Sequence, residues 1–308
     1  MSVSLSKLGF GAAQFRLGGP PVARGRSPEA EVGEILSIAA RSGLTVFDTS
    51  VGATYAEDVI GKQLPRPCRF RVVIKTARAD RGPDYVEAEA RATLKRLDLP
   101  RAEAIVVQSA GDLFGPHGDD VWKRLLQLRD EGLFELVGVS VFASDDPVGI
   151  VKRFKPDIVQ APASLLDQRL LVDGTLATIA EWGVEVQLRS IFLQGLLFLP
   201  PDRIPSPLKG AASRLSRVRR MIAEGRSDPL QAALGFALSR PEASSVIVGV
   251  TTAAELQAIV AAALSPPPDL DWDDMALDDP EMIERQGWAA AYSAFRKVGT
   301  GFQIKRAT

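Results

Sequence analysis

Eight short apolar runs alternate with helix-like segments along nearly the whole chain of 308 residues. We interpret the runs as buried strands; they cover 8–12, 44–48, 71–75, 103–107, 136–140, 157–160, 184–189 and 245–248. Strict alternation of strand and helix is typical of a parallel sheet closed by right-handed crossovers. No Gly-x-Gly-x-x-Gly fingerprint lies between a strand and a helix, which argues against an open dinucleotide-binding sheet. The sequence predicts a single-domain α/β protein, a (β/α)8 (TIM) barrel over 1–268, with 269–308 as a C-terminal tail packing on it.

Local signals place several helix ends. Ser27, Pro28 and Glu29 together form a strong helix start, because Ser caps, Pro fits the first position and an acid favours the first turn. Ser144 is a possible N-cap for the helix after the fifth strand. One helix is predicted over 171–182, ended by Gly183.

Composition excludes several classes of function. Hydrophobic residues make up 46% of the chain and the formal net charge is −1, so no charge excess suggests binding to nucleic acid or an acidic membrane. One cysteine and one histidine supply neither a disulfide framework nor a metal site rich in these residues. No apolar stretch is long enough to span a membrane. We expect a soluble, cytoplasmic protein that acts on a small molecule and holds no metal; the oligomeric state stays open.

Polar residues end three successive runs. Asp48 ends the second, Lys75 ends the third, and Gln108 follows the fourth. In such barrels, active sites are built at the carboxyl ends of the strands. The three side chains are therefore candidate catalytic residues, and Asp48 and Lys75 are expected to form an ion pair.

Several segments together resemble the aldo-keto reductase superfamily, whose members are (β/α)8 barrels that use NAD(P)H. One part of the resemblance lies in Phe47-Asp48-Thr49 with the downstream Glu57 and Gly61. The other parts are Gly138-Val139-Ser140, the segment Val159-Gln160 with Leu165-Leu166-Asp167-Gln168-Arg169, and Arg189-Ser190-Ile191-Phe192-Leu193-Gln194-Gly195-Leu196-Leu197. The last segment, with its RS-x-FLQGLL pattern, resembles a bacterial branch of the superfamily.

The catalytic set of the family, Asp, Tyr, Lys and His, is incomplete here. Asp48 and Lys75 match, but the tyrosine position falls on Ala53 and the histidine position on Gln108. Loss of a general acid costs about 10²–10⁴ in rate, so slow or rewired turnover is expected. Tyr55, two residues past the expected position, reaches Lys75 only if the preceding loop bulges; the alternative is that it packs on the barrel rim.

The resemblance also implies a cofactor site. Ser140 and Gln160 would hold the nicotinamide carboxamide, and Arg189 takes the place of the aromatic residue beneath the ring. The loop with Ser190, Phe192 and Gln194 would cover the pyrophosphate. The adenosine end would meet Gly249, Thr251 and Glu255. Because Glu255 stands where many relatives place a basic residue for the 2′-phosphate, the cofactor is expected to be NAD or NADP with NAD favoured.

Three functional hypotheses follow. The first is an NAD(P)(H)-dependent oxidoreductase of the aldo-keto reductase type acting on a carbonyl or sugar-like small molecule. The second is a cofactor-binding pseudoenzyme without turnover. The third is a non-redox lyase or epimerase on a nucleotide sugar, with Lys75 as the base. Retention of Ser140 and Gln160 favours the first two.

Overall fold

Eight parallel strands close into a barrel in the order of the sequence, β1 to β8, with β8 paired to β1. The computed structural model describes residues 5–12, 15, 28–49, 54–204, 206–277, 279 and 283. The strands are β1 (Leu8–Gly11), β2 (Val46–Asp48), β3 (Arg71–Lys75), β4 (Ala102–Val107), β5 (Phe134–Ser140), β6 (Ile158–Pro162), β7 (Glu185–Arg189) and β8 (Ala243–Gly249). The predicted single-domain (β/α)8 barrel is thereby confirmed.

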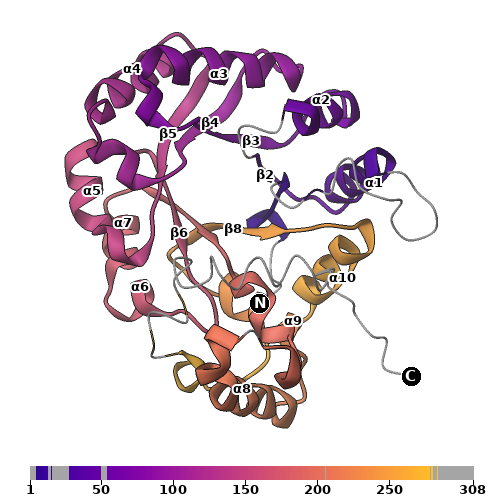
Figure 1. The fold of residues 1–308 in the computed structure, drawn as a ribbon. Coiled ribbons are helices and arrows are strands. Elements are labelled where there is room, and N and C mark those ends of the chain that lie inside the picture. Colours follow the sequence, from indigo (N-terminus) through magenta and orange to yellow (C-terminus); the bar gives the residue numbers. More distant parts are fainter. Residues whose placement is uncertain are drawn as a thin grey trace.

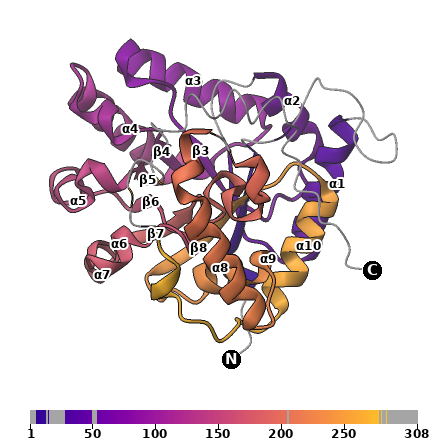
Figure 2. The same ribbon diagram turned by 60° about the horizontal axis from the view of Figure 1, so that its bottom comes forward.

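A ring of helices surrounds the strands (Figures 1 and 2). The α-helices are α1 (Pro28–Arg41), α2 (Thr54–Gln63), α3 (Pro83–Arg96), α4 (Gly118–Asp130), α5 (Pro147–Phe154), α6 (Arg169–Val172), α7 (Thr175–Glu181), α8 (Ala212–Glu224), α9 (Pro229–Leu238) and α10 (Ala253–Leu264). Among them, α4, α7 and α9 each contact the strand that follows in sequence, β5, β7 and β8.

The strands bury side chains on both faces, as expected for a parallel barrel. One face packs against the helices in the large outer core, to which Phe10 and Phe47 contribute with ring centroids 4.8 Å apart. The other face fills the barrel with a separate apolar cluster. Its members come from five strands: Val46, Val73, Ala104, Val106, Ile158 and Ile247. Because adjacent residues of a strand face opposite sides, Asp48 and Lys75 share the inner face with Val46 and Val73.

Two predicted helix boundaries were wrong. The helix predicted over 171–182 is two helices, α6 and α7, separated at Gly174, whose φ of 76° is left-handed and breaks the helix. The helix after β5 begins at Pro147, and its N-cap is Asp146, whose Oδ1 accepts from Gly149 N at 3.1 Å. Ser144 lies earlier, in a 3-10 turn (Ala143–Asp145).

Glu57 and Gly61, which follow Phe47-Asp48-Thr49 in one of the segments that carry the resemblance, lie on α2 where it packs against α3. Glu57 is 1% exposed and accepts hydrogen bonds from Arg96 and from the Thr93 hydroxyl. Gly61 lies so close to α3 that an added Cβ would be 2.1 Å from the Arg96 carbonyl oxygen. Glu57 and Gly61 therefore serve packing between helices.

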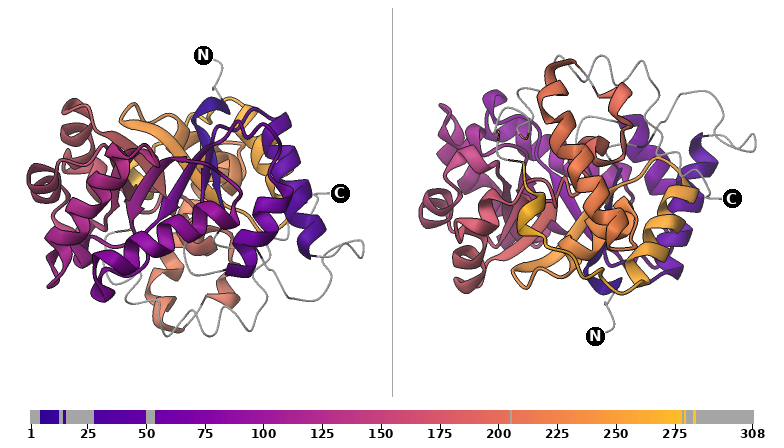
Figure 3. Two further views of the ribbon diagram at one scale, coloured as in Figure 1. Left: turned by 90° about the horizontal axis from the view of Figure 1, so that it is seen from above. Right: turned by 90° about the horizontal axis from the view of Figure 1, so that it is seen from below.

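The connection after β7 projects from the end of the barrel opposite the N-terminus (Figure 3). It contains three 3-10 helices, Leu193–Phe198, Pro201–Arg203 and Ser206–Ala211. Arg219 of α8 binds its backbone, donating to the carbonyl oxygens of Leu197 at 3.0 Å, Leu196 at 3.3 Å and Leu199. One guanidinium group thus holds a turn of this connection against α8.

The segment after α10 contacts the barrel through Leu277. Met275 and Leu277 are buried, and Leu277 N donates to the Leu166 carbonyl oxygen at 2.9 Å. The predicted tail beyond this point lies outside the described residues, apart from Asp279 and Ile283. In the described ranges, no helix has the length and apolar character needed to cross a membrane.

Candidate functional site

A buried ion pair joins two strands at the carboxyl end of the barrel. Lys75 Nζ contacts Asp48 Oδ2, and the two residues are 7% and 8% exposed. Asp48 is the last residue of β2 and Lys75 the last of β3. Their position above the apolar interior follows from the alternation that points Val46 and Val73 inward. The expected pairing of these two side chains is therefore present in the structure.

A second set of hydrogen bonds runs from this pair across the barrel. Gln160 Nε2 donates to Asp48 Oδ1 at 3.1 Å and to Gln187 Oε1 at 3.0 Å, and both glutamines are fully buried. Gln160 Oε1 and Gln187 Nε2 are buried atoms with no hydrogen-bond partner among the described residues. Buried polar atoms in folded proteins are usually paired, so a pair of such atoms beside an ion pair indicates a ligand or water site.

Gln108 lies at the same end of the barrel but is exposed to solvent. It directly follows β4, its side chain is exposed, and its backbone N–H donates to Thr76 Oγ1 at 3.2 Å. Ala53, at the expected tyrosine position, lies outside the described residues. The amide of Gln108 can donate a hydrogen bond to a carbonyl, but it cannot give up a proton near pH 7.

Tyr55 does not fill the catalytic position for which the sequence made it a candidate. Its side chain is 54% exposed, and its hydroxyl donates to Glu29 Oε1 in the first turn of α1 at 2.7 Å. This hydrogen bond raises the pKa of Tyr55 above its ordinary value, which makes it a weaker acid. Tyr55 lies in the first turn of α2 and its hydroxyl pairs with α1, which agrees with the alternative that Tyr55 packs on the barrel rim.

The predicted nicotinamide contacts lie on three neighbouring strands. Ser140 ends β5, is 3% exposed and pairs in register with Gln160 of β6. Arg189 ends β7 and reaches back to the end of β5, where it donates to the Val141 carbonyl oxygen at 2.7 Å. Its guanidinium carbon lies 4.6 Å from the centroid of the Phe142 ring. Phe142 thus stacks on one face of the Arg189 guanidinium group, which was expected to stack on the nicotinamide ring.

The loop after β7 has an unusual backbone. Ser190 and Leu193 adopt left-handed φ values of 61° and 42°, and Gly195 follows at 86°. For a leucine this conformation costs about 1–3 kcal/mol and persists only where the surroundings enforce it, typically at functional sites. Phe192 is half-buried and packs edge-on against Phe198, with ring centroids 5.5 Å apart. Gln194 belongs to the 3-10 helix; its side chain is outside the described part.

The residues expected at the adenosine end surround the N-terminus of α10. Gly249 ends β8. Glu255 Oε2 accepts from Thr251 N at 2.7 Å and from the Thr251 hydroxyl at 2.6 Å. Thr252 and Glu255 also form a capping box, in which Glu255 N donates to Thr252 Oγ1 at 3.1 Å and Thr252 N donates to Glu255 Oε2 at 3.3 Å. A second carboxylate, Glu31 of α1, accepts from Ala253 N at 2.6 Å.

Three polar residues near the carboxyl end of the barrel were not predicted from the sequence as part of the site: Gln187, Glu31 and Arg219. Gln187 had a usable signal, because it lies two residues before Arg189 in the same predicted strand and so shares its face. Glu31 and Arg219 had none, since their partners are 222 and 20 to 23 residues away and depend on how the helices pack.

The described residues contain no group of three or more His, Cys, Asp or Glu side chains that could hold a metal ion. The polar groups available at the site are an ammonium–carboxylate pair, two buried amides and a serine hydroxyl. Together with the barrel, this arrangement defines a (β/α)8 protein whose candidate active site relies on side chains of β2, β3, β5, β6 and β7.

The Aldo/keto reductase family model matches residues 7–276, so the chain belongs to the Aldo/keto reductase family. Among curated proteins, it is 26% identical over 219 residues to the NADH-specific methylglyoxal reductase of Escherichia coli, covering 63% of this chain and 66% of that protein. It is 26% identical over 280 residues to L-galactose dehydrogenase of Arabidopsis thaliana, covering 84% and 85%. The holo form of the aldo-keto reductase AKR11C1 from Bacillus halodurans has a similar fold, with a TM-score of 0.71 at 20% identity over 87% of this chain and 89% of that one.

Proposed function

We propose that this protein binds a nicotinamide dinucleotide, NAD(H) in preference to NADP(H), and slowly reduces a small carbonyl or sugar-like compound. The observation that carries the proposal is the buried Asp48–Lys75 pair at the active end of an aldo/keto reductase barrel. The names of the two curated relatives, a methylglyoxal reductase and a galactose dehydrogenase, support this class of substrate.

The cofactor side of the proposal rests on buried polar groups. Ser140 and Gln160 are adjacent in the sheet, and Gln160 Oε1 is an acceptor that lacks a partner among the described residues. The amide of Gln160 turns its nitrogen to Asp48 and its oxygen away. That oxygen is complementary to a carboxamide N–H. When bound, the nicotinamide would supply the hydride.

The chain's own residues would then orient the carbonyl and provide the proton. Gln108 can donate a hydrogen bond to the carbonyl oxygen from the open mouth of the barrel. The tyrosine is replaced and Tyr55 binds Glu29, so Lys75 is the group in the described part of the site that carries a transferable proton. Proton transfer to a forming alkoxide from Lys75 completes the reduction.

Binding and turnover are tested separately. NADH fluorescence should change on binding to the purified protein, and methylglyoxal should be reduced with a turnover number well below about 10 s⁻¹, the median for enzymes. Replacing Ala53→Tyr together with Gln108→His should raise the rate by about 10² or more, because it restores an acid and a donor. Fast turnover of the wild type would contradict the assignment of a weakened proton donor.

The placement of Tyr55 also favours a second candidate, a cofactor-binding pseudoenzyme. Under that hypothesis, NADH binds but no carbonyl substrate is reduced, and the double substitution creates activity where none existed. The lyase or epimerase hypothesis has less support, because Lys75, the base it requires, is engaged by Asp48.

A further inference from the structure

Gln187, in the middle of β7, is a polar residue that the proposed reduction does not use. Its side chain is fully buried, and its Oε1 accepts from Gln160 Nε2 at 3.0 Å. The two residues are partners in the pairing of β6 with β7, and Gln160 shares the inner face of the barrel with Ile158. Gln187 Nε2 has no hydrogen-bond partner among the described residues, which is costly for a buried atom. Packing alone therefore does not explain a glutamine at this position.

The amide of Gln160 is held by acceptors on two different strands. Asp48 Oδ1 of β2 accepts from Gln160 Nε2 at 3.1 Å, so the nitrogen of this amide faces Asp48. The same nitrogen also donates to Gln187 Oε1 of β7. Because a primary amide nitrogen has two hydrogens, both donors of Gln160 are used. The atom left over is Gln160 Oε1, a buried acceptor with no partner among the described residues.

One hydrogen bond to Asp48 would leave the Gln160 amide free to rotate about that contact, whereas two acceptors fix the plane of the amide and the direction of Oε1. We propose that Gln187 is a positioning residue that aims Gln160 Oε1 at an N–H of the ligand, so that the site selects a carboxamide over a group without N–H. Gln187 acts through Gln160 and needs no contact with the ligand. The inference rests on the proposed function, which places the nicotinamide carboxamide beside Gln160.

Two dinucleotides separate this role from general packing. NADH carries a carboxamide, whereas reduced acetylpyridine adenine dinucleotide keeps the carbonyl and has a methyl group in place of the NH2. The analogue therefore leaves Gln160 Oε1 unpaired. The dissociation constants of both compounds are measured by calorimetry on the full chain. We expect the wild type to bind NADH about tenfold more tightly than the analogue, which is the scale of one buried hydrogen bond.

Gln187→Met and the shorter Gln187→Leu remove the acceptor, and each should lower the ratio of the two constants to about twofold, mainly through weaker NADH binding. Gln187→Glu keeps an oxygen that can accept from Gln160 Nε2 and should keep the ratio of the wild type. Gln168→Met is the matched control. Gln168 is 4% exposed and donates to the carbonyl oxygens of Leu165 at 3.1 Å and Trp272 at 2.6 Å. Its loss should leave the ratio unchanged even where the melting temperature falls.

Three results would overturn the inference. In the first, the wild type binds NADH and the analogue equally, a comparison that needs no variant. In the second, Gln187→Met and Gln187→Leu keep the ratio of the wild type or change it no more than Gln168→Met does, which shows a purely structural role. In the third, Gln187→Glu folds and loses the ratio as fully as Gln187→Met. NADH binding without discrimination overturns this inference alone, whereas a wild type that binds neither dinucleotide overturns the proposed function as well.

Discussion

Asp48 and Lys75 hold opposite charges at the carboxyl end of the barrel, above the aliphatic cluster that fills its interior. Such a pair is costly to desolvate, so each member depends on the other. Gln160 supplies one more hydrogen bond to Asp48 Oδ1 and leaves Oδ2 for Lys75. At the residue scale, the site is therefore both the candidate catalytic apparatus and a point of structural sensitivity.

Lys75→Met tests this dependence. The substitution leaves the Asp48 carboxylate buried without its counter-ion, which should lower the free energy of unfolding by about 3–5 kcal/mol. Adding Asp48→Asn should recover most of the loss, because Asn keeps an oxygen for the Gln160 amide and carries no charge. Urea unfolding of the wild type and both variants measures the effect. Equal instability of the single and double variants would show that packing, and not charge, dominates.

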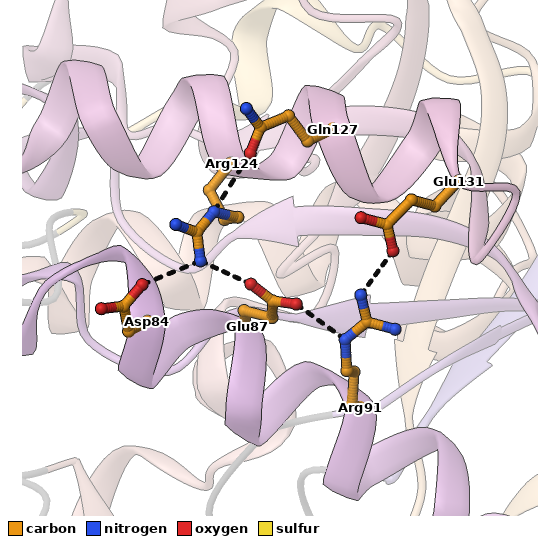
Figure 4. A network of polar contacts seen from close by, with 6 residues as sticks. All are labelled: Asp84, Glu87, Arg91, Arg124, Gln127 and Glu131. Atoms are coloured by element: carbon orange, nitrogen blue, oxygen red, sulfur yellow. Dashed lines mark hydrogen bonds and ion pairs between the residues drawn. The ribbon is translucent and has the colours of Figure 1, made fainter.

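At the scale of elements, α3 and α4 are joined by a chain of charged side chains on the outside of the barrel (Figure 4). Arg124 of α4 contacts Asp84 and Glu87 of α3, and Arg91 of α3 contacts Glu87 and, beyond the end of α4, Glu131. Glu87 is the central member, since both arginines bind it. The hydrogen bond from Arg91, with that from Arg124, holds the pKa of Glu87 below its ordinary value even though burial opposes the shift.

This network predicts a defined pH dependence. A carboxyl group with a lowered pKa in the folded state stabilises the fold fully above its unfolded pKa of about 4.3, and the contribution is lost as the pH falls through the folded value. Glu87→Gln should therefore cost about 1 kcal/mol at pH 7, the scale of partly exposed ion pairs in a network. The difference from wild type should shrink as the pH falls below about 4.3 and vanish below the lowered pKa of the folded state.

Urea unfolding across this pH range measures both curves. The control is Glu135→Gln, which removes one member of an exposed pair with Arg101 at 3.4 Å. That variant should differ little from wild type at any pH. A loss of stability for Glu87→Gln that persists unchanged at pH 3 would mean that the charge of Glu87 is not its source.

For the molecule as a whole, the carboxyl ends of the strands carry the candidate site, and their amino-terminal ends carry a cluster that stabilises the barrel. At the amino-terminal ends of the strands, Arg71 of β3 donates to Glu103 of β4 at 2.8 Å and to Glu185 of β7 at 2.9 Å. Burial acts to lower the pKa of Arg71, but the two carboxylates outweigh it and the net shift is upward. This cluster ties three strands together at the end opposite Asp48 and Lys75, where polar residues of such barrels serve stability.

Arg71→Met should lower the free energy of unfolding by about 1–3 kcal/mol, less than for a fully buried pair because these side chains are partly exposed. NADH affinity should not change, since the site is at the other end. The triple variant Arg71→Met with Glu103→Gln and Glu185→Gln should regain stability by removing the uncompensated carboxylates. Altered NADH binding in the single variant would show that the two ends are coupled.

The sequence by itself determined the barrel and the pairing of Asp48 with Lys75. Strand alternation is local, and carboxyl ends of parallel strands gather at one end of a barrel, so polar residues that end consecutive runs must become neighbours. Tertiary structure alone decided that Tyr55 binds Glu29, that Gln187 extends the hydrogen bonds of Gln160, and that Glu31 caps α10. These contacts depend on side-chain direction and on the packing of elements 26 to 222 residues apart, which no local pattern of residues encodes.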